Sequence, residues 1–276
     1  MRAPRAVGTP LDNGRKKGWI DRFLHYRYPP SQLEIEQWVA QFDTEHEDLA
    51  ARLLDSVDVI KRQQMDQAFR SLMDALPGWH RSKSKRQGRW RFIPYSMSAG
   101  ESGDVMISYL RQALGMRQRH YDELFIQPQL LPDARLSQDD TVVLVDDFAG
   151  SGDQACGSWD KFFKELVGDV GNVYLLVVAA SRRAQLEIGA RTDMQLMAHI
   201  NLMESDNIFS EKCHRFSDDD KAALLGYCTK HFPKVPKGYG DCGLIFVLQH
   251  DCPNNTIPIL HGHNKRWQPL FPRSSP

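Results

Sequence analysis

Residues 141–154 constrain the fold of this chain more than any other stretch. The segment reads TVVLVDDFAGSGDQ, and its first five residues are continuous and β-prone. We therefore expect a short strand that is buried on both faces. Two carboxylates, Asp146 and Asp147, come next, at the end of a strand where open α/β sheets bind their ligands. A turn containing Gly150 and Gly152 follows and leads into a segment with helical character.

This order of elements predicts a phosphate site. Glycines allow positive φ angles and close backbone approach, and the free N–H groups of such a turn meet the start of a helix. Backbone N–H groups in this arrangement bind anions. The alternative is a buried strand, an acidic turn and a capped helix without a ligand.

The run from Val142 to Gln154 resembles the phosphoribosyl-diphosphate (PRPP) signature of type I phosphoribosyltransferases. The resemblance implies that Asp146 and Asp147 are catalytic residues that face the ribose hydroxyls and help to bind Mg²⁺. It also implies a loop for the 5′-phosphate, made of Ala149, Gly150, Ser151, Gly152, Asp153 and Gln154. The family usually has threonines where this chain has Gly150 and Gln154. Their absence weakens the case for catalysis more than the case for binding.

A second strand–loop–helix unit precedes this motif. We expect a strand at residues 91–96, at the edge of the sheet because it contains Pro94, and a helix at residues 104–114. The same resemblance assigns the loop between them to diphosphate. Its residues are Ser98, Ala99, Gly100, Glu101, Ser102 and Gly103. An ordinary Ser/Gly turn is the alternative.

Further strands are expected at residues 172–180 and 195–203, with a helix at residues 181–192 between them. A shorter strand could lie at residues 121–131. Alternating strands and helices predict an α/β fold, with a mostly parallel sheet and helices on both faces. This is the fold of type I phosphoribosyltransferases.

The N-terminal part of the chain reads differently. We expect a flexible basic tail at residues 1–18, because arginines and lysines are mixed there with Pro and Gly. Apolar residues at helical spacing predict a helical region at residues 19–80, with a capping box that begins at Ser31. Residues 81–276 would then form the phosphoribosyltransferase-like domain.

A C-terminal strand at residues 244–249 leads into a turn that carries Asn254 and Asn255. If this strand is parallel to the central strand, the turn emerges at the same edge as the acidic pair. The two amides would then suit a base or a ribose. An Asx turn without a ligand is equally compatible with the sequence.

Residues 81–91 read RSKSKRQGRWR and carry the strongest local charge. Basic side chains beside Trp79 and Trp90 could hold a nucleic-acid backbone or help to bind diphosphate. A solvated loop is the alternative reading.

Composition narrows the function classes. The formal net charge is +0, so any contact with nucleic acid or a membrane would have to be local. The five cysteines lack C-x-x-C spacing and indicate reduced thiols. With no long apolar run or signal-like segment, we expect a cytoplasmic protein that does not contact membranes.

The ending GYGD and PNNTIPIL, together with the central motif, resembles a divergent phosphoribosyltransferase-like lineage of bacterial conflict loci, including retron antiphage systems. The resemblance implies an effector or accessory subunit that works with a reverse transcriptase and its RNA–DNA product. The protein is either an enzyme that transfers phosphoribose from PRPP or an inactive nucleotide-sensing or scaffold subunit. A third hypothesis is a nucleic-acid-binding subunit that uses residues 81–91. The acceptor and the oligomeric state are left open.

Overall fold

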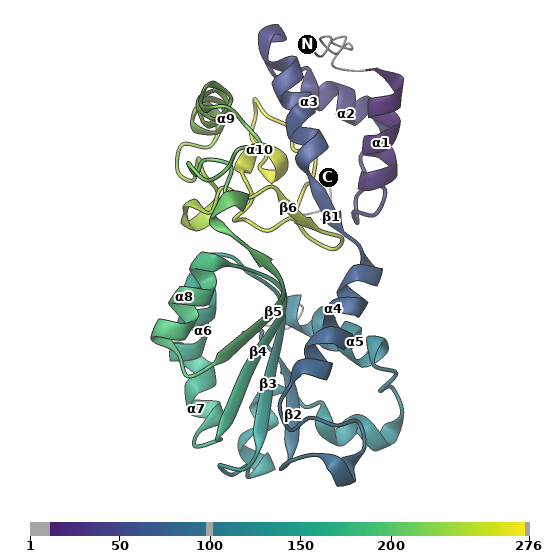
Figure 1. Cartoon of the computed structure of the whole chain (residues 1–276), viewed down its shortest axis with the longest axis vertical. Coiled ribbons are helices and arrows are strands. Elements are labelled where there is room, and N and C mark those ends of the chain that lie inside the picture. Colours follow the sequence, from purple (N-terminus) through teal and green to yellow (C-terminus); the bar gives the residue numbers. More distant parts are fainter. Residues whose placement is uncertain (1–11, 98–101, 274–276) are drawn as a thin grey trace, which may run out of the picture. The chain divides into compact units, whose positions relative to one another are not determined.

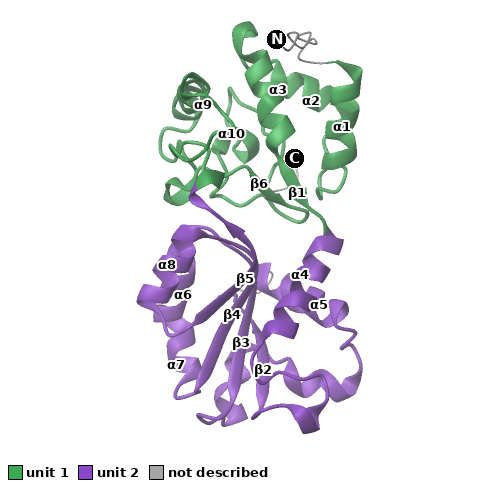
Figure 2. Cartoon of the chain, viewed as in Figure 1, with its two compact units in different colours: residues 1–61, 205–276 green, residues 62–204 purple. Residues whose placement is uncertain are grey.

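The computed structural model describes residues 12–97 and 102–273, which form two compact units (Figure 2). Unit 1 combines Met1–Lys61 with Ser205–Pro276, and unit 2 is Arg62–Glu204. These bounds differ from the predicted regions, because residues 62–80 belong with the sheet and residues 205–276 do not. The reason is that helix α4 (Arg62–Ala75) packs against strands of unit 2.

Unit 2 is built on a four-stranded parallel sheet with the order β2-β3-β4-β5. The strands are β2 (Trp90–Pro94), β3 (Thr141–Ala149), β4 (Asn172–Ser181) and β5 (Gln195–Leu202). This confirms the predicted α/β class, and β2 lies at the edge, as Pro94 predicts.

Helices cover both faces of this sheet (Figure 1). Helices α4 and α5 (Ser102–Ala113) lie on one face. The other face carries α6 (Asp153–Ser158), a π-helical turn (Trp159–Phe163), α7 (Lys164–Val167) and α8 (Arg182–Arg191). Residues 142–145 of β3 have no exposed surface, which explains their unbroken apolar run.

The strand expected at residues 121–131 is not formed. A 3₁₀ helix (Arg119–Leu124) stands there, and a single bridge joins Phe125 to Phe92 of β2. Further short 3₁₀ segments are Lys83–Lys85, Pro128–Leu130, Pro132–Ala134, Glu204–Asp206 and Tyr239–Asp241. Pro128 and Pro132 occupy the starts of two of these turns and interrupt any strand pairing.

Unit 1 is mainly helical. Its helices are α1 (Asn13–Phe23), α2 (Gln32–Val39), the 3₁₀ turn Thr44–His46, α3 (Glu47–Ser56), α9 (Asp218–His231) and α10 (Pro258–His261). Strands β1 (Asp58–Ile60) and β6 (Phe246–Leu248) pair in parallel and form a separate two-stranded sheet. The predicted strand at residues 244–249 is therefore present but belongs to this unit.

Aromatic side chains fill the core of unit 1. The indole N–H groups of Trp38 and Trp267 both donate to the carbonyl of Ile259, at 3.0 and 2.8 Å. Both indoles are almost fully buried, so this shared acceptor satisfies two polar groups that would otherwise be costly. The residues expected at helical spacing thus form core contacts.

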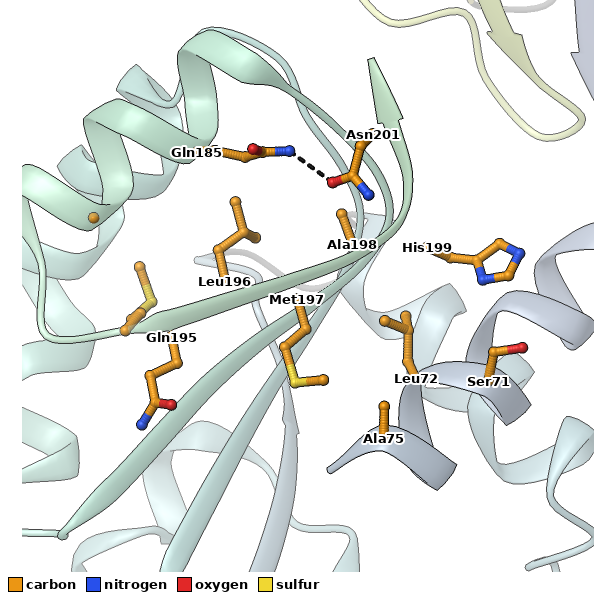
Figure 3. Close-up of a pocket in the computed structure, with 12 residues that line it drawn as sticks. Ser71, Leu72, Ala75, Gln185, Gln195, Leu196, Met197, Ala198, His199 and Asn201 are labelled. Carbon is orange, nitrogen blue, oxygen red and sulfur yellow. Dashed lines mark hydrogen bonds between the residues drawn. The ribbon is translucent and has the colours of Figure 1, made fainter. Parts of the chain in front are cut away.

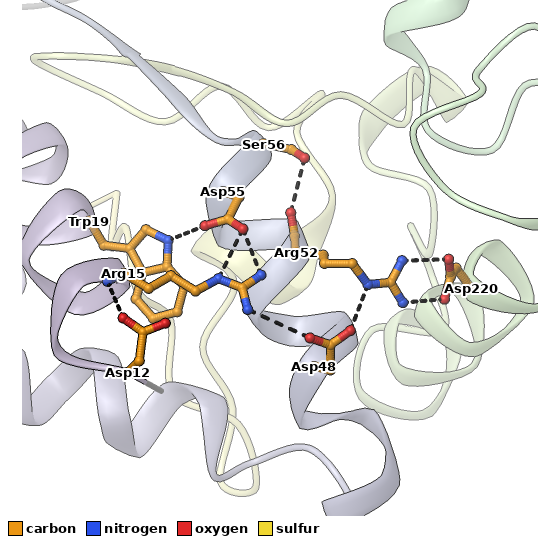
Figure 4. A network of polar contacts seen from close by, with 8 residues as sticks. All are labelled: Asp12, Arg15, Trp19, Asp48, Arg52, Asp55, Ser56 and Asp220. Carbon is orange, nitrogen blue, oxygen red and sulfur yellow. Dashed lines mark hydrogen bonds and ion pairs between the residues drawn. The ribbon is translucent and has the colours of Figure 1, made fainter. Parts of the chain in front are cut away.

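Helix α1 begins inside the segment predicted to be a flexible tail. The Asp12 carboxylate caps its start by accepting from Arg15 N at 2.9 Å. Arg15 and the indole of Trp19 both bind Asp55 of α3, at 2.6 and 2.7 Å (Figure 4). These contacts order the helix, whereas residues 1–11 of the predicted tail lie outside the described residues.

Within residues 12–97 and 102–273, no helix is long and apolar enough to cross a bilayer.

Candidate functional site

The acidic pair lies near the carboxyl end of β3. This strand ends at Ala149, four residues beyond its predicted end. Asp146 and Asp147 are 8% and 9% exposed, so both residues are largely shielded from solvent. The Ser102 hydroxyl, at the start of α5, donates to Asp146 Oδ1 at 2.6 Å. The Asp147 amide donates to the same oxygen at 2.9 Å. Two residues predicted for one site are therefore in direct contact.

The electrostatics of this pair favour a cation. Burial raises the pKa of Asp146 well above its usual range, and the neighbouring Asp147 carboxylate raises it further. The hydrogen bonds from Ser102 and the Asp147 amide offset only part of this effect. A positive charge beside the pair would remove the penalty.

The oxygen donors of Asp146 and Asp147 are the kind that Mg²⁺ prefers. Within the described ranges, no group of three or more His, Cys, Asp or Glu side chains could hold a metal ion. An ion at this pair would take most of its ligands from water and from the oxygens of a bound molecule. Mg²⁺ commonly binds in this way beside phosphates.

The predicted phosphate loop is held tightly at two points. The Ser181 hydroxyl donates to the carbonyl of Gly150, and Ser181 also caps α8. Gly152 has a φ of +87°, and a Cβ atom there would lie 2.9 Å from Cβ of Glu187. Only glycine fits this position without displacing its neighbours.

The loop amides are not all available. Asp153 N–H donates to the Ser151 hydroxyl at 3.3 Å, inside the loop itself. Ala149, Gly150, Ser151 and Gly152 are buried, whereas Gln154 is exposed. The turn therefore has a fixed backbone shape at the carboxyl end of β3, next to the acidic pair.

Two side chains that position this region were not predicted from the sequence. Ser181 was expected only as the start of a helix. Tyr95 follows β2, and its hydroxyl donates to the carbonyl of Ala155 at 2.5 Å. Burial raises the pKa of Tyr95, so the phenol stays protonated and donates. For Ser181, the only sign in the sequence of a positioning role was a serine at the junction of a strand and a helix.

The predicted diphosphate loop is only partly described. Ser98, Ala99, Gly100 and Glu101 lie outside the described residues. Ser102 and Gly103 are not in a loop but form the first residues of α5. A Cβ atom on Gly103 would lie 2.4 Å from Ser96 Oγ, so the glycine lets α5 start against the end of β2.

Asn254 and Asn255 belong to unit 1. The expected shared edge is not formed, because β6 pairs with β1 and not with the four-stranded sheet. Asn255 is buried and donates to the carbonyl of Tyr239 at 2.9 Å, while the Asn254 carbonyl accepts from Tyr239 N at 2.8 Å. These contacts hold a turn in unit 1.

A groove also lies along β5 (Figure 3). It has a volume of about 610 Å³ and is flanked by α4 and α8. Met197 points toward Leu72 and Ala75, and Gln185 donates to Asn201 at 2.7 Å. The lining carries no carboxylate, lysine or arginine, so it suits neither Mg²⁺ nor a phosphate. None of the residues that line this groove belongs to the predicted site.

Comparison with models of known protein families shows which family this chain belongs to. The family model described as PRTase-CE matches residues 35–273, which is most of the chain. The protein belongs to the PRTase-CE family. The match starts in α2, so this phosphoribosyltransferase-like family includes both units and not only the sheet. A search of curated proteins found no match.

Proposed function

We propose that this PRTase-CE protein binds PRPP, or a related phosphoribosyl nucleotide, together with Mg²⁺. The observation that carries the proposal is the buried Asp146–Asp147 pair at the carboxyl end of β3, next to the fixed turn at Gly152. Ligands of open α/β sheets bind at this edge. Membership of a phosphoribosyltransferase-like family supports the same ligand class.

Different residues would bind different parts of the ligand. Asp146 and Asp147 would orient the ribose hydroxyls and stabilise the positive charge that develops at C1 as diphosphate leaves. The turn at residues 149–154 would hold the 5′-phosphate through its backbone. Ser102, whose hydroxyl donates to the Asp146 carboxylate, would help to receive diphosphate. Bound Mg²⁺ would neutralise charge on the diphosphate.

Most of the rate enhancement in such a site would come from positioning. The fixed backbone at Gly152 and the hydrogen bond from Ser102 supply the rigidity that positioning requires. The transfer would break the C1–oxygen bond to diphosphate and form a bond from C1 to an acceptor nucleophile, whose proton leaves to solvent.

The second candidate is a sensor or scaffold that binds the same molecule without turnover. It is favoured by Gly150 and Gln154, which lack the hydroxyls usual at these positions in phosphoribosyltransferases. A buried Gly150 whose carbonyl accepts from Ser181 contributes shape but no side-chain donor.

Calorimetric titration of PRPP with Mg²⁺ tests the pocket. We expect binding to the wild type and its loss in Asp146→Asn/Asp147→Asn. The matched control is Asp139→Asn, which removes one exposed carboxylate from the same unit. Equal binding to all three proteins would refute the proposed pocket. Diphosphate measured in the same samples separates the enzyme from the sensor.

We also propose that the protein is a cytoplasmic effector or accessory subunit of a retron-type antiphage system. Its partner would be a reverse transcriptase with its RNA–DNA product. The support is the resemblance of the central motif and the C-terminal ending to that lineage. Phage plating with the wild type and the double aspartate variant, both expressed with the neighbouring genes, tests this role. Undiminished protection by the variant would separate defence from the pocket.

A further inference from the structure

The basic segment at residues 81–91 forms a surface that the proposed PRPP site does not use. It contains Arg81, Lys83, Lys85, Arg86, Arg89 and Arg91. The acidic residues packed against it are Glu123, Asp139 and Asp140. Six positive charges and three negative ones leave +3 here, whereas the whole chain has a net charge of +0. The positive charge is therefore concentrated locally.

Hydrogen bonds to neutral groups hold three arginines of this surface in place, whereas Arg89 pairs with Asp140. Arg81 donates to the Tyr121 hydroxyl at 3.1 Å and to the Gly115 carbonyl at 3.3 Å. Arg86 donates to the carbonyls of His80 and Arg81, both at 2.7 Å. Arg91 donates to the Trp90 carbonyl at 2.8 Å. None of these contacts neutralises a guanidinium.

Aromatic rings add to this preorganisation. The Arg86 guanidinium lies 4.7 Å from the centroid of Trp79, and Arg81 lies 5.8 Å from that of Tyr121. Trp90 is 2% exposed, so it belongs to the core and has no face for a ligand. The arginines are thus placed before any ligand arrives, which lowers the entropy cost of binding.

The Glu123 carboxylate interacts electrostatically with Lys83, Arg86 and Arg91. Lys83 pairs with Glu123 at 2.9 Å. Burial lowers the pKa of Arg86 and Arg91, and the attraction of Glu123 offsets this only partly. A phosphate would compensate these charges better, because its oxygens match the donor fork of arginine.

The basic surface lies at the end of the sheet where β2 begins (Figure 1), whereas the acidic pair lies in the carboxyl-terminal half of β3. Arg91 pairs with Val142 in the parallel register, four residues before Asp146. At about 3.3 Å per residue, this is about 13 Å along the strand. The hypothesis that this segment assists diphosphate at the acidic pair does not fit this distance.

A stacking platform adjoins the basic surface. The rings of His120 and Tyr121 lie with centroids 3.9 Å apart, and His120 is exposed. Tyr121 also contacts Arg81. Exposed rings beside phosphate-binding cations are typical of surfaces that bind unpaired bases. An acidic peptide would use the cations but not the rings.

We propose that this surface binds single-stranded nucleic acid, with phosphates on Arg81, Lys83, Arg86 and Arg91 and a base stacked on His120. The preformed arginine forks, the local charge and the adjoining rings together select this partner. The binding is independent of the pocket at Asp146.

Fluorescence anisotropy with a labelled oligouridylate, measured over a range of salt concentrations, tests the proposal on the full chain. Arg81→Gln/Lys83→Gln should weaken binding at least tenfold. It should also reduce the slope of log K against log salt by about 1.4, because each contact to a single strand contributes about 0.7. The matched control is Lys161→Gln/Lys164→Gln, which removes two exposed lysines elsewhere in unit 2 and should bind as the wild type does.

Two further measurements identify the partner. His120→Ala should weaken binding about fivefold or more without changing the salt slope, since stacking contributes about 1–3 kcal/mol per base. Asp146→Asn/Asp147→Asn should bind the oligonucleotide as the wild type does, which keeps this test separate from that of the pocket.

Three results would overturn the proposal. They are equal loss of binding in the test and control variants, equal competition by polyglutamate, and tighter binding of duplex than of single strands. Absence of oligonucleotide binding at low salt would also refute it.

Discussion

Replacing Asp140 by asparagine tests how unit 2 fixes the starts of β2 and β3. The buried Asp140 carboxylate accepts from Arg89 N, Nε and Nη2 at 2.7, 3.1 and 2.7 Å. It also accepts from the amide and hydroxyl of Ser137, at 2.7 and 3.0 Å. An asparagine amide would place an NH₂ group against several of these donors. The substitution therefore removes most of the network without removing volume.

The size of the effect follows from the pKa of Asp140. Burial alone would raise this pKa, but hydrogen bonds from Arg89 and Ser137 outweigh burial and lower it to about 2 from 3.8. That difference corresponds to about 2 kcal/mol of stability. Because the Arg89 side chain is 49% exposed and its charge is screened, we expect a loss of about 1 to 2 kcal/mol at pH 7.

The pH dependence has a definite sign. The pKa is lower in the folded state, so the wild type holds this stability above pH 3.8 and loses it as the pH falls toward 2. Asp140→Asn lacks the titrating group, so the gap between the two proteins should narrow below pH 4. Urea unfolding at several pH values measures the gap.

Asp139→Asn is the control, because Asp139 is the exposed neighbour in the same turn. It should change the free energy of unfolding by less than about 0.5 kcal/mol. A stability loss in Asp140→Asn that stays constant from pH 7 to pH 2.5 would refute the electrostatic account. So would equal effects of the two substitutions.

Three further predictions concern other positions. Gly152→Ala should destabilise the fold by about 2 kcal/mol because of the positive φ, whereas Gly157→Ala, in open space on α6, should stabilise it by about 0.5 kcal/mol in the same urea assay. Arg52→Lys should cost about 1 kcal/mol, since lysine loses the two 2.7 Å bonds to Asp220 that the guanidinium fork makes (Figure 4); an unchanged urea midpoint would contradict this. Burial lowers the pKa of His261 from 6.5 to about 4, so the neutral ring contributes about 3 kcal/mol of stability that is complete above pH 6.5 and is lost as the pH falls toward 4. The pKa of the His261 ring can be measured by NMR titration. A titration midpoint near pH 6.5 would contradict this prediction.

The sheet of unit 2 follows closely from the sequence, because its signals are local. The strand at residues 172–180 and the helix after it were both predicted within about one residue of β4 and α8. Their apolar runs and caps lie within single segments, and the right-handed crossover rule orders them. The edge position of β2 also follows from one residue, Pro94, which lacks an amide donor.

Unit 1 was less predictable because its organisation depends on distant pairings. Asp58 of β1 lies beside Phe246 of β6, which is 188 positions later in the chain of 276 residues. Val57 and Ile60 fitted a helical spacing, and only the presence of β6 makes residues 58–60 a strand. Tertiary context outweighed local pattern here. Asn255 is buried because it bonds to Tyr239, which is 16 positions away.

At the candidate site, the sequence identified the residues but not their contacts. Ser102 and Asp146 were both predicted, for diphosphate and for ribose. The 2.6 Å hydrogen bond between them depends on α5 starting against the end of β2, which Gly103 permits. Ser181 was missed because its hydroxyl acts on a residue 31 positions away. A serine that begins a helix carries no sign of such a second contact.

The basic surface at residues 81–91 and the acidic pair at Asp146 and Asp147 interact only weakly. They lie about 13 Å apart along β3, and burial raises the pKa of Asp146, which lowers the negative charge at the acidic pair. Asp146 therefore contributes little repulsion to a polyanion on the basic surface, where the local charge is +3. Neutralising Asp146 should change oligonucleotide affinity less than twofold, while neutralising Arg81 should leave PRPP binding unchanged. One parallel sheet thus has room for two independent anion sites, one at each end of its strands.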